Sequence, residues 1–420
     1  MPDAQGRVAF VTLGCKVNQT ESEAIAAELG AVSAGCAPQD ADVVVVNTCT
    51  VTGEADRKAR KAVRHALALP RSPIVIVTGC LATLDPGKLA ALGERVVVEA
   101  DKERVSARAA EALDARGAHI RGATAPERPR SARTRAQLKV EDGCDAFCTY
   151  CIVPYARGVP RAVPADRVVA EAERLLAAGA SEIVLTGINI GRYDDAGIGL
   201  PELLLRVAAT GVPRIRFSSI EPGDVTAQLL GAAQETPAFC AHLHVPLQSG
   251  SDAVLARMGR PYDIARYTAR IEAARAAFPG IAISTDIIVG FPGETDAEFA
   301  GTLAFAEGLG FSRLHVFRYS QRAGTRAADM PGQVPATVRA ERSAALRALG
   351  ERLALAYTNA QVDRVVEVLV ERASEGIAEG TTREYVRARA ASASARPGQL
   401  LGVMTERVDP GPLLTGTVLP

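Results

Sequence analysis

The chain has 420 residues, which exceeds the size at which one hydrophobic core stops growing, so two or three domains are expected. Its 48 Lys and Arg residues equal its 48 Asp and Glu residues, so overall charge indicates no nucleic-acid partner and any basic surface must be local. The start, MPDAQGRVAF, shows no basic leader before an apolar stretch, and no later apolar run could span a membrane, so we expect a cytoplasmic protein with no membrane partner.

The first part of the chain alternates β-branched runs with Ala-rich amphipathic segments, the pattern of a parallel sheet covered by helices. RVAFVTLGC precedes a predicted helix near 21–29, ADVVVVNTC one near 53–69, and SPIVIVTGC one near 85–92. Each strand-like run ends in a cysteine. Cys15, Cys49 and Cys80 should therefore lie at the carboxyl edge of the sheet, where open α/β sheets bind ligands.

Three thiolates at one edge suit a soft metal or an iron–sulfur cluster. Eight cysteines in the whole chain are too few for a disulfide scaffold, which also favours metal binding or catalysis. The alternative is that all three are small buried apolar side chains. Cys36 precedes the strand at 43–46, toward the opposite edge of the sheet, so it is not counted as a ligand.

The helix that follows Cys49 is rich in basic residues. At helical spacing Arg57, Lys61 and Arg64 share one face, which could follow a phosphate backbone. An ordinary solvated helix face explains the same pattern.

Residues 121–137, RGATAPERPRSARTRAQ, have two prolines and five arginines against one glutamate, without apolar periodicity, and are predicted to be a basic interdomain linker. The strand-like AQLKVED follows, and then EDGCDAFCTYC with Cys144, Cys148 and Cys151 in C-x3-C-x2-C spacing. Three thiolates on one tight loop can hold a four-iron cluster at three corners and leave one iron open for chemistry. S-adenosylmethionine has adjacent amino and carboxylate groups that can chelate such an iron. Zinc with a fourth ligand from elsewhere is the alternative.

The stretches TLGCKVNQTESEAI, NTCTVT, TGC and DGCDAFCTYCIVPYARG resemble the radical S-adenosylmethionine methylthiotransferase family, and the resemblance covers nearly the whole chain. It implies an α/β protein with an N-terminal open parallel α/β sheet domain at 1–120, which carries an auxiliary cluster. After the linker, it implies a central partial (β/α)6 radical S-adenosylmethionine barrel at 138–358 and a small all-β TRAM-like barrel at 359–420.

The resemblance also implies which residues bind the cofactor, at the ends of strand-like runs such as SEIVLTGINIG and RIRFSSIEPGD. Contacts with S-adenosylmethionine are assigned by similarity to Gly187, Asn189, Ser218, Glu221, Gln248 and Ser249. Glycine permits close backbone approach, and the polar groups can bind ribose hydroxyls, the amino group or the carboxylate. Ordinary strand capping is the alternative. His242 and His244 stay unassigned, and Cys240 is expected to pack rather than bind.

The implied reaction uses two [4Fe-4S] clusters. The catalytic cluster at Cys144, Cys148 and Cys151 makes a radical from S-adenosylmethionine, and the cluster at Cys15, Cys49 and Cys80 presents the sulfur. One S-adenosylmethionine methylates that sulfur, and a second supplies the radical that activates a substrate carbon.

The front motif TLGCKVNQ most resembles enzymes that convert N6-threonylcarbamoyladenosine, beside the anticodon of tRNA, to its 2-methylthio derivative. The expected partners are thus the anticodon stem-loop of tRNA and an electron-donor protein, but not DNA. Related branches act on isopentenyladenosine in tRNA or on an aspartate of a ribosomal protein. The non-enzymatic alternative is an iron–sulfur protein that binds RNA through its tail.

Residues 361–420 carry seven Arg, no Lys and eight acidic residues, which departs from a strongly basic RNA-binding surface. Basic residues are available in the linker and at Arg339, Arg342, Arg347 and Arg352, so RNA contact is expected to be shared among domains.

Overall fold

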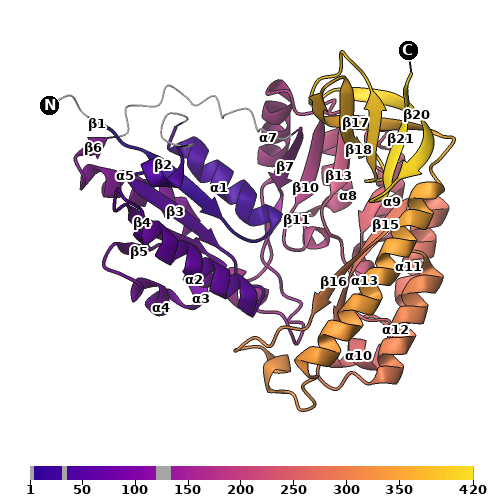
Figure 1. The fold of residues 1–420 in the computed structure, drawn as a ribbon, viewed down its shortest axis with the longest axis horizontal. Coiled ribbons are helices and arrows are strands. Elements are labelled where there is room, and N and C mark those ends of the chain that lie inside the picture. Colours follow the sequence, from indigo (N-terminus) through magenta and orange to yellow (C-terminus); the bar gives the residue numbers. More distant parts are fainter. Residues whose placement is uncertain (1–3, 31–35, 120–133, 420) are drawn as a thin grey trace.

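Three bodies follow one another along the chain in the structure, a computed structural model that describes residues 4–30, 36–119 and 134–419 (Figure 1). An N-terminal α/β sheet lies beside a central curved sheet, and a small barrel covers one end of the central sheet. The predicted α/β class and the order of its parts are confirmed. None of the described helices has the length and apolar character needed to cross a membrane.

The N-terminal body is a four-stranded parallel sheet in the order β2-β3-β4-β5, with a separate pair β1-β6 at its side. Its elements are β1 (Ala4–Gln5), β2 (Val8–Thr12), α1 (Lys16–Glu28), η1 (Pro38–Asp40), β3 (Val43–Thr48), α2 (Gly53–Leu67), β4 (Ile74–Gly79), α3 (Cys80–Leu84), α4 (Pro86–Ala90), β5 (Val96–Val98), η2 (Lys102–Arg104), α5 (Val105–Asp114) and β6 (Ala118–His119). The central strand β3 is buried along its whole length, because α2 covers one face of the sheet while α1 and α5 cover the other.

One predicted helix start is wrong by several residues, and one short helix was not predicted. The first helix begins at Lys16 rather than near residue 21. The helix predicted near 85–92 is α4, and the additional short helix α3 begins at Cys80, ahead of it. At the start of α1 and of α3 a glycine with positive φ precedes the cysteine, Gly14 at 107° and Gly79, the last residue of β4, at 88°, so the chain enters the helix at or just after the cysteine.

The central body is a row of six parallel strands in two hydrogen-bonded sheets, β7-β10-β13 and β14-β15-β16, joined at β13 and β14 by the bridge between Ile215 and Phe239. Its strands are β7 (Arg135–Lys139), β10 (Glu182–Thr186), β13 (Arg214–Phe217), β14 (His242–His244), β15 (Ala282–Val289) and β16 (Arg313–Arg318). The helices between and after them are α7 (Ala165–Ala177), α8 (Leu200–Ala208), α9 (Ala227–Gln234), α10 (Asp252–Arg257), α11 (Ile264–Ala277), α12 (Asp296–Leu309) and α13 (Ala336–Asn359). This alternation is the predicted partial (β/α)6 barrel.

Short elements fill the loops of this body, namely β8 (Glu141–Asp142), α6 (Val153–Arg157), β9 (Arg161–Ala162), η3 (Ile190–Arg192), β11 (Asp194–Asp195), β12 (Ile198–Gly199), η4 (Pro222–Asp224) and η5 (Arg326–Asp329). Most of the predicted linker lies outside the described residues. Its last three residues, 135–137, belong to β7 instead, because they pair with β10 from Glu182 onward.

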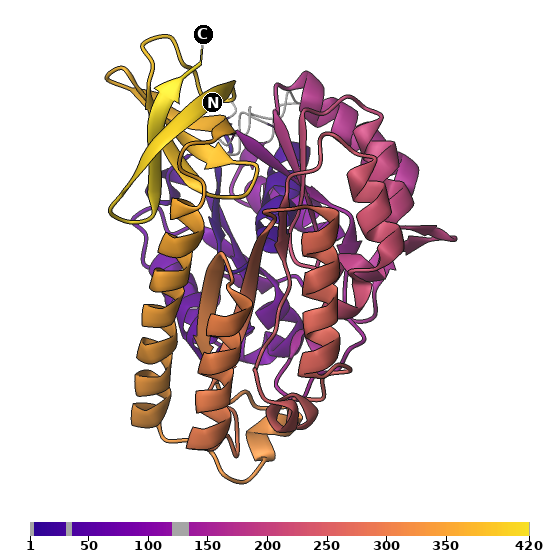
Figure 2. The same ribbon diagram turned by 90° about the vertical axis from the view of Figure 1, so that its right-hand side faces the viewer.

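The C-terminal body is a closed five-stranded barrel in the order β17-β18-β19-β21-β20, as expected for a TRAM-like module. Its strands are β17 (Val365–Ser374), β18 (Ile377–Thr382), β19 (Arg387–Ala391), β20 (Leu400–Asp409) and β21 (Leu413–Val418). The barrel sits at the end of α13, against the amino-terminal ends of the central strands (Figure 2).

A buried charge cluster fastens the barrel there. Glu182 pairs with Arg214 at 2.8 Å and with Arg216 at 2.9 Å, and all three side chains are almost fully buried. Arg214 Nη2 also donates to the carbonyl of Thr382 in the barrel at 2.8 Å. The guanidinium of Arg216 lies over the ring of Tyr385, so cation–π contact supports the same junction.

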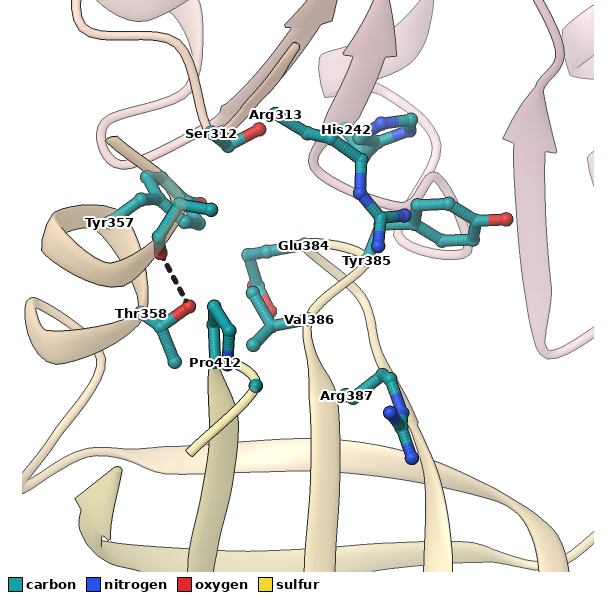
Figure 3. A pocket seen from close by; sticks show the side chains of 12 residues that line it. His242, Ser312, Arg313, Tyr357, Thr358, Glu384, Tyr385, Val386, Arg387 and Pro412 are labelled. Carbon is teal, nitrogen blue, oxygen red and sulfur yellow. Dashed lines mark hydrogen bonds between the residues drawn. The ribbon is translucent and has the colours of Figure 1, made fainter. Parts of the chain in front are cut away.

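A cavity of about 90 Å³ remains at this junction, lined by residues such as His242, Arg313, Tyr357 and Tyr385 (Figure 3). Both His242 and Arg313 are the first residues of their strands. The cavity is therefore at the end of the partial barrel away from the cysteine loops, and it is not the predicted site.

Candidate functional site

The three N-terminal cysteines occupy equivalent places in the fold. Cys15 is the N-cap of α1, Cys49 follows the last residue of β3, and Cys80 follows the last residue of β4. The prediction that they lie together at the carboxyl edge of the parallel sheet is confirmed. Cys36 precedes β3 and lies away from them, as expected.

These cysteine loops are in direct contact. A Cβ atom placed on Gly14 would lie 2.5 Å from Cβ and 3.0 Å from Sγ of Cys49, so only glycine fits before Cys15. Asn18 ties the loops together, because its Nδ2 donates to the carbonyls of Leu13 at 2.8 Å and Thr48 at 2.9 Å. Burial raises the pKa of both Cys49 and Cys80.

The C-x3-C-x2-C loop is held by backbone contacts. Gly143, with φ at 100°, lies so close to the backbone of Val159 that an added Cβ would fall 2.1 Å from its carbonyl oxygen. The N–H of Cys144 donates to Gly158 O, and that of Cys151 donates to Cys148 O, both at 2.9 Å. These bonds fold the chain so that the three cysteines lie within a single short loop. Burial raises the pKa of Cys151 to about 12.

Arg260, which the sequence reasoning missed, supplies a cation to this loop. Its Nη1 donates to Cys148 Sγ at 3.0 Å, and its Nη2 is hydrogen-bonded and ion-paired to Glu221. The guanidinium side chain is 3 % exposed, so the contact is made with little screening by water. A guanidinium that donates to a cysteine sulfur can compensate the negative charge of a thiolate bound to iron.

Arg157, also missed, connects the two sets of cysteines. It ends the helix α6 that follows Cys151, and its Nη2 donates to Asn18 Oδ1 at 2.5 Å. Its charge also lowers the pKa of Cys80 in the N-terminal body, against the larger effect of burial. One buried guanidinium therefore contacts the N-terminal cysteine site from the helix that begins just after the other cysteine loop.

Two carboxylates lie among three cations in the cluster around Arg157. Its Nη1 lies 3.0 Å from Glu21 Oε1 and 2.7 Å from Asp142 Oδ1, and Glu21 also pairs with Lys102 and Lys139. Burial opposes ionisation of Glu21, yet Lys139, Arg157 and Lys102 hold its pKa below the ordinary value. A cavity of about 1060 Å³ opens beside this cluster and is lined in part by Cys80.

Two of the predicted cofactor residues, Gly187 and Asn189, lie beside the carboxyl group of Glu141, which the sequence reasoning did not identify as a site residue. Glu141 Oε2 accepts from the backbone N–H groups of Ile188 at 3.0 Å and Asn189 at 2.8 Å. An added Cβ on Gly187 would lie 2.8 Å from that oxygen, so the glycine permits the contact. Burial raises the pKa of Glu141 to about 7.

Ser218 and Asn189 follow adjacent strands, β13 and β10, and each has a buried side-chain oxygen without a hydrogen-bond partner in the described part of the chain. Buried polar atoms rarely stay unpaired, so these two atoms suit contacts with a bound molecule. Glu221 lies in the next loop segment, paired with Arg260 near Cys148.

Gln248 and Ser249 are placed differently. Gln248 has φ at 69°, and its backbone bonds bridge to Asp286 and Ile288 of β15. The hydroxyl of Ser249 is fully buried and lies 3.3 Å from Thr302 Oγ1 of α12. That contact favours packing over direct cofactor contact for Ser249.

The remaining residues noted in the sequence have internal partners. Both His242 and His244 face Ser284 Oγ at 3.0 Å, and His244 also lies 3.2 Å from Asp286. Cys240 is fully buried with its thiol toward Glu182, in agreement with a packing role.

Over residues 4–30, 36–119 and 134–419, no three His, Cys, Asp or Glu side chains converge closely enough to coordinate one metal ion. In a four-iron cluster each cysteine binds its own iron, so the thiols need not meet at one point. Each cysteine set has an arginine that acts on one thiol: Arg157 lowers the pKa of Cys80 through its charge, and Arg260 donates to Cys148 Sγ. This donor set fits anionic thiolate clusters.

Comparison with protein families agrees with this arrangement. The Radical SAM superfamily matches residues 138–306, and the Uncharacterized protein family UPF0004 matches residues 7–99. The chain is 39% identical over 405 residues to the threonylcarbamoyladenosine tRNA methylthiotransferase MtaB of Bacillus subtilis, covering 90% of this chain and 89% of that protein. For the enzyme of that name from Thermotoga maritima the identity is 37%, with 90% of each chain covered. The tRNA-2-methylthio-N(6)-dimethylallyladenosine synthase of Novosphingobium aromaticivorans is 39% identical, with 86% of each chain covered.

Solved structures show the same fold at low sequence identity. The radical S-adenosylmethionine methyltransferase TsrM of Kitasatospora setae superposes with a TM-score of 0.57 at 14% identity, covering 77% of each chain. The cobalamin-dependent S-adenosylmethionine radical enzyme OxsB gives 0.52 at 12% identity, covering 83% of this chain and 56% of that one.

The fold and the cysteine loop thus define a radical S-adenosylmethionine enzyme, which uses that cofactor together with an iron–sulfur cluster. Within this class the chain belongs to the methylthiotransferase family and transfers a sulfur-containing group.

Proposed function

We propose that the protein converts N6-threonylcarbamoyladenosine in tRNA, beside the anticodon, to its 2-methylthio derivative. The observation that carries this proposal is the juxtaposition of two separate three-cysteine sites, linked through Arg157, in a chain of this family. One site suits radical generation and the other suits sulfur donation, and methylthio transfer requires both. We further propose that each site holds a [4Fe-4S] cluster, that an electron-donor protein reduces them, and that the reaction occurs in the cytoplasm, where tRNA is found.

When bound, the clusters and S-adenosylmethionine supply the 5′-deoxyadenosyl radical and the methylated sulfur. The protein's own residues bind and orient the clusters and S-adenosylmethionine. Cys144, Cys148 and Cys151 would hold one cluster beside Arg260, and Cys15, Cys49 and Cys80 would hold the other beside Arg157. The unpaired oxygens of Asn189 and Ser218 would accept hydrogen bonds from S-adenosylmethionine.

Placement of the N-terminal body supports this division of labour. Along one edge of the partial barrel, Gln19 of α1 lies against Gln137 of β7, at 3.4 Å between their side-chain amides. At the other edge, Arg322, after β16, bonds the side chains of Thr50 and Asp56. The N-terminal body therefore contacts both edge strands of the open barrel. Cys15 is close in sequence to Gln19 at one contact, and Cys49 directly precedes Thr50 at the other.

The branches of the family differ in substrate, so the substrate of this enzyme depends on the branch to which the chain belongs. Three relatives with the name threonylcarbamoyladenosine tRNA methylthiotransferase match at 35–39% identity over 90% of this chain. Relatives with the name tRNA-2-methylthio-N(6)-dimethylallyladenosine synthase match at 37–39%. Identity alone does not separate these branches, and TLGCKVNQ around Cys15 favours the threonylcarbamoyl substrate.

The test uses anaerobically reconstituted protein, dithionite, S-adenosylmethionine and two tRNA preparations, one carrying threonylcarbamoyladenosine and one carrying isopentenyladenosine. Nucleoside mass spectrometry should find the methylthio product only in the first. Product only in the second would assign the enzyme to the branch that acts on isopentenyladenosine in tRNA. Product in neither, with 5′-deoxyadenosine still formed, would exclude both tRNA substrates and favour the ribosomal-protein aspartate.

A further inference from the structure

A basic groove of about 560 Å³ lies between the start of α2, the end of β16 and the first half of α13. Four arginines line it, Arg57, Arg318, Arg339 and Arg347, and we call it the arginine groove. They come from two bodies, because Arg57 belongs to the N-terminal α2 while the others belong to the central body. Figure 1 shows α13 alongside β16.

The charge of the groove is poorly compensated. Within the described residues, Arg57, Arg318 and Arg347 have neither an ion pair nor a side-chain hydrogen bond. Arg339 donates only to a carbonyl, that of Tyr319 at 2.6 Å. Glu54 is the one carboxylate among the lining residues, and it already pairs with Lys58 at 2.9 Å. The groove therefore presents several guanidinium groups to a ligand with multiple negative charges.

Two further residues indicate a bound ligand. Ser343 lies between Arg339 and Arg347 on one face of α13, and its buried hydroxyl has no hydrogen-bond partner in the part of the chain that the structure describes. Phe317, at the end of β16, is 48% exposed beside Arg318. An exposed aromatic ring next to cations is the combination on which nucleic-acid bases stack while phosphates are bound.

Other arginines of the same helix do not contribute. Arg342 is buried and pairs with Glu294 and Asp296, and Arg352 pairs with Glu307 at 3.1 Å. The positive charge of the helical segment is thus concentrated at its groove-facing positions.

We propose that the arginine groove binds phosphodiester groups of the RNA substrate, an inference that rests on the proposed function. Thr52 of the groove is three residues from Cys49, so their Cα atoms are at most about 11 Å apart. RNA held there by its backbone would have an adjacent nucleoside near the N-terminal cysteines. The groove lies near the carboxyl end of β16, whereas the acidic C-terminal barrel covers the amino-terminal end of the central strands.

The test compares Arg318→Ala/Arg347→Ala with a matched control, Arg266→Ala/Arg270→Ala. The control removes two exposed arginines from α11 that have no ion pair in the described residues and lie outside the groove. Binding of an anticodon stem-loop RNA to the reconstituted enzyme is followed by fluorescence anisotropy at several salt concentrations. Thermal unfolding midpoints confirm that both variants fold as the wild type does.

The groove variant should bind roughly tenfold more weakly, and the slope of log K against log salt should shrink by about 1.5, because two phosphate contacts are lost. The control should retain the affinity and slope of the wild type. Equal affinity and slope in the groove variant and the control would overturn the proposal. Displacement of the RNA by inorganic phosphate at matched ionic strength would also overturn it, since the groove would then be a small-anion site.

The proposed function is tested separately by the methylthio product of the wild type. Loss of RNA affinity in the groove variant, with no methylthio nucleoside formed by the wild type, would leave the groove assignment standing and reject the reaction. Methylthio product from the wild type, with no effect of the groove arginines on RNA binding, would support the reaction and reject the groove assignment.

Discussion

Arg157 Nη1 lies 3.0 Å from Glu21 Oε1, which joins the helix after the C-x3-C-x2-C loop to the first helix of the N-terminal body. Both side chains are buried, at 3% and 6% exposure. This ion pair fixes the relative position of two cysteine sites that lie far apart in sequence.

Replacement of this arginine should be strongly destabilising. Arg157→Met leaves Asp142 and Glu21 without their buried guanidinium, and the free energy of unfolding should fall by about 3 kcal/mol. Urea unfolding followed by circular dichroism measures the change. Arg206→Met breaks an exposed i,i+4 pair with Glu202 and should cost less than about 0.5 kcal/mol. Equal losses in the two variants would contradict the role given to Arg157.

Glu141 should make stability depend on pH. Its folded-state pKa is raised to about 7 from an ordinary value of 4.5, so between these values the folded protein retains a proton that the unfolded chain releases. The wild type should therefore lose stability as pH rises from about 4.5 to about 7. Glu141→Gln keeps an acceptor for the N–H groups of Ile188 and Asn189.

The Gln variant should lack this part of the pH dependence, so its stability relative to the wild type should rise by about 3 kcal/mol as pH rises from below 4.5 to above 7. Thermal unfolding midpoints across the pH range measure the difference. Glu202→Gln, at an exposed position, serves as the control and should follow the wild-type profile. A Glu141→Gln profile parallel to that of the wild type would show that this carboxyl does not titrate in the window.

Arg260 should matter for radical formation. Arg260→Met removes the cation from Cys148 and leaves Glu221 without its partner, so the yield of 5′-deoxyadenosine should fall roughly tenfold. Arg257→Met is the control, because Arg257 lies three residues earlier and pairs with Glu298 instead. An undiminished yield from Arg260→Met, at equal iron content, would reject a role for the guanidinium at this site.

The buried cluster at Glu182 should hold the C-terminal barrel. Glu182→Ala leaves Arg214 and Arg216 buried without a carboxylate, which should cost about 3 to 5 kcal/mol and loosen the junction. Limited proteolysis should then cut between α13 and β17 faster than in the wild type. Glu379→Ala, which breaks a partly exposed pair with Arg389, should leave the cleavage rate unchanged.

The sequence predicted those features that depend on local pattern. Strand-like runs ending in Cys15, Cys49 and Cys80 placed the cysteines at one edge of a parallel sheet, because parallel strands share their carboxyl ends. The alternation of strands and helices likewise predicted the partial barrel. The start of the first helix was predicted less well, since Gly14, with its positive φ, lets the chain enter α1 earlier than apolar periodicity indicates.

Contacts between residues on separate loops or bodies could not be predicted in the same way. Arg157, Arg260 and Asn18 are ordinary polar residues in sequence, and their partners are more than 100 positions away or on another loop. The same holds for the arginine groove, which forms only when α2 meets α13. Such pairings follow from tertiary packing and leave no periodic signal.

The central claim is that two distinct cysteine sites perform two distinct tasks. The most direct test measures 5′-deoxyadenosine and methylthio nucleoside from the same reactions of the wild type, Cys148→Ala and Cys49→Ala. We expect both products from the wild type, neither from Cys148→Ala, and 5′-deoxyadenosine without methylthio nucleoside from Cys49→Ala. Methylthio product from Cys49→Ala, or loss of 5′-deoxyadenosine in that variant despite an intact cluster at Cys144, Cys148 and Cys151, would contradict the account.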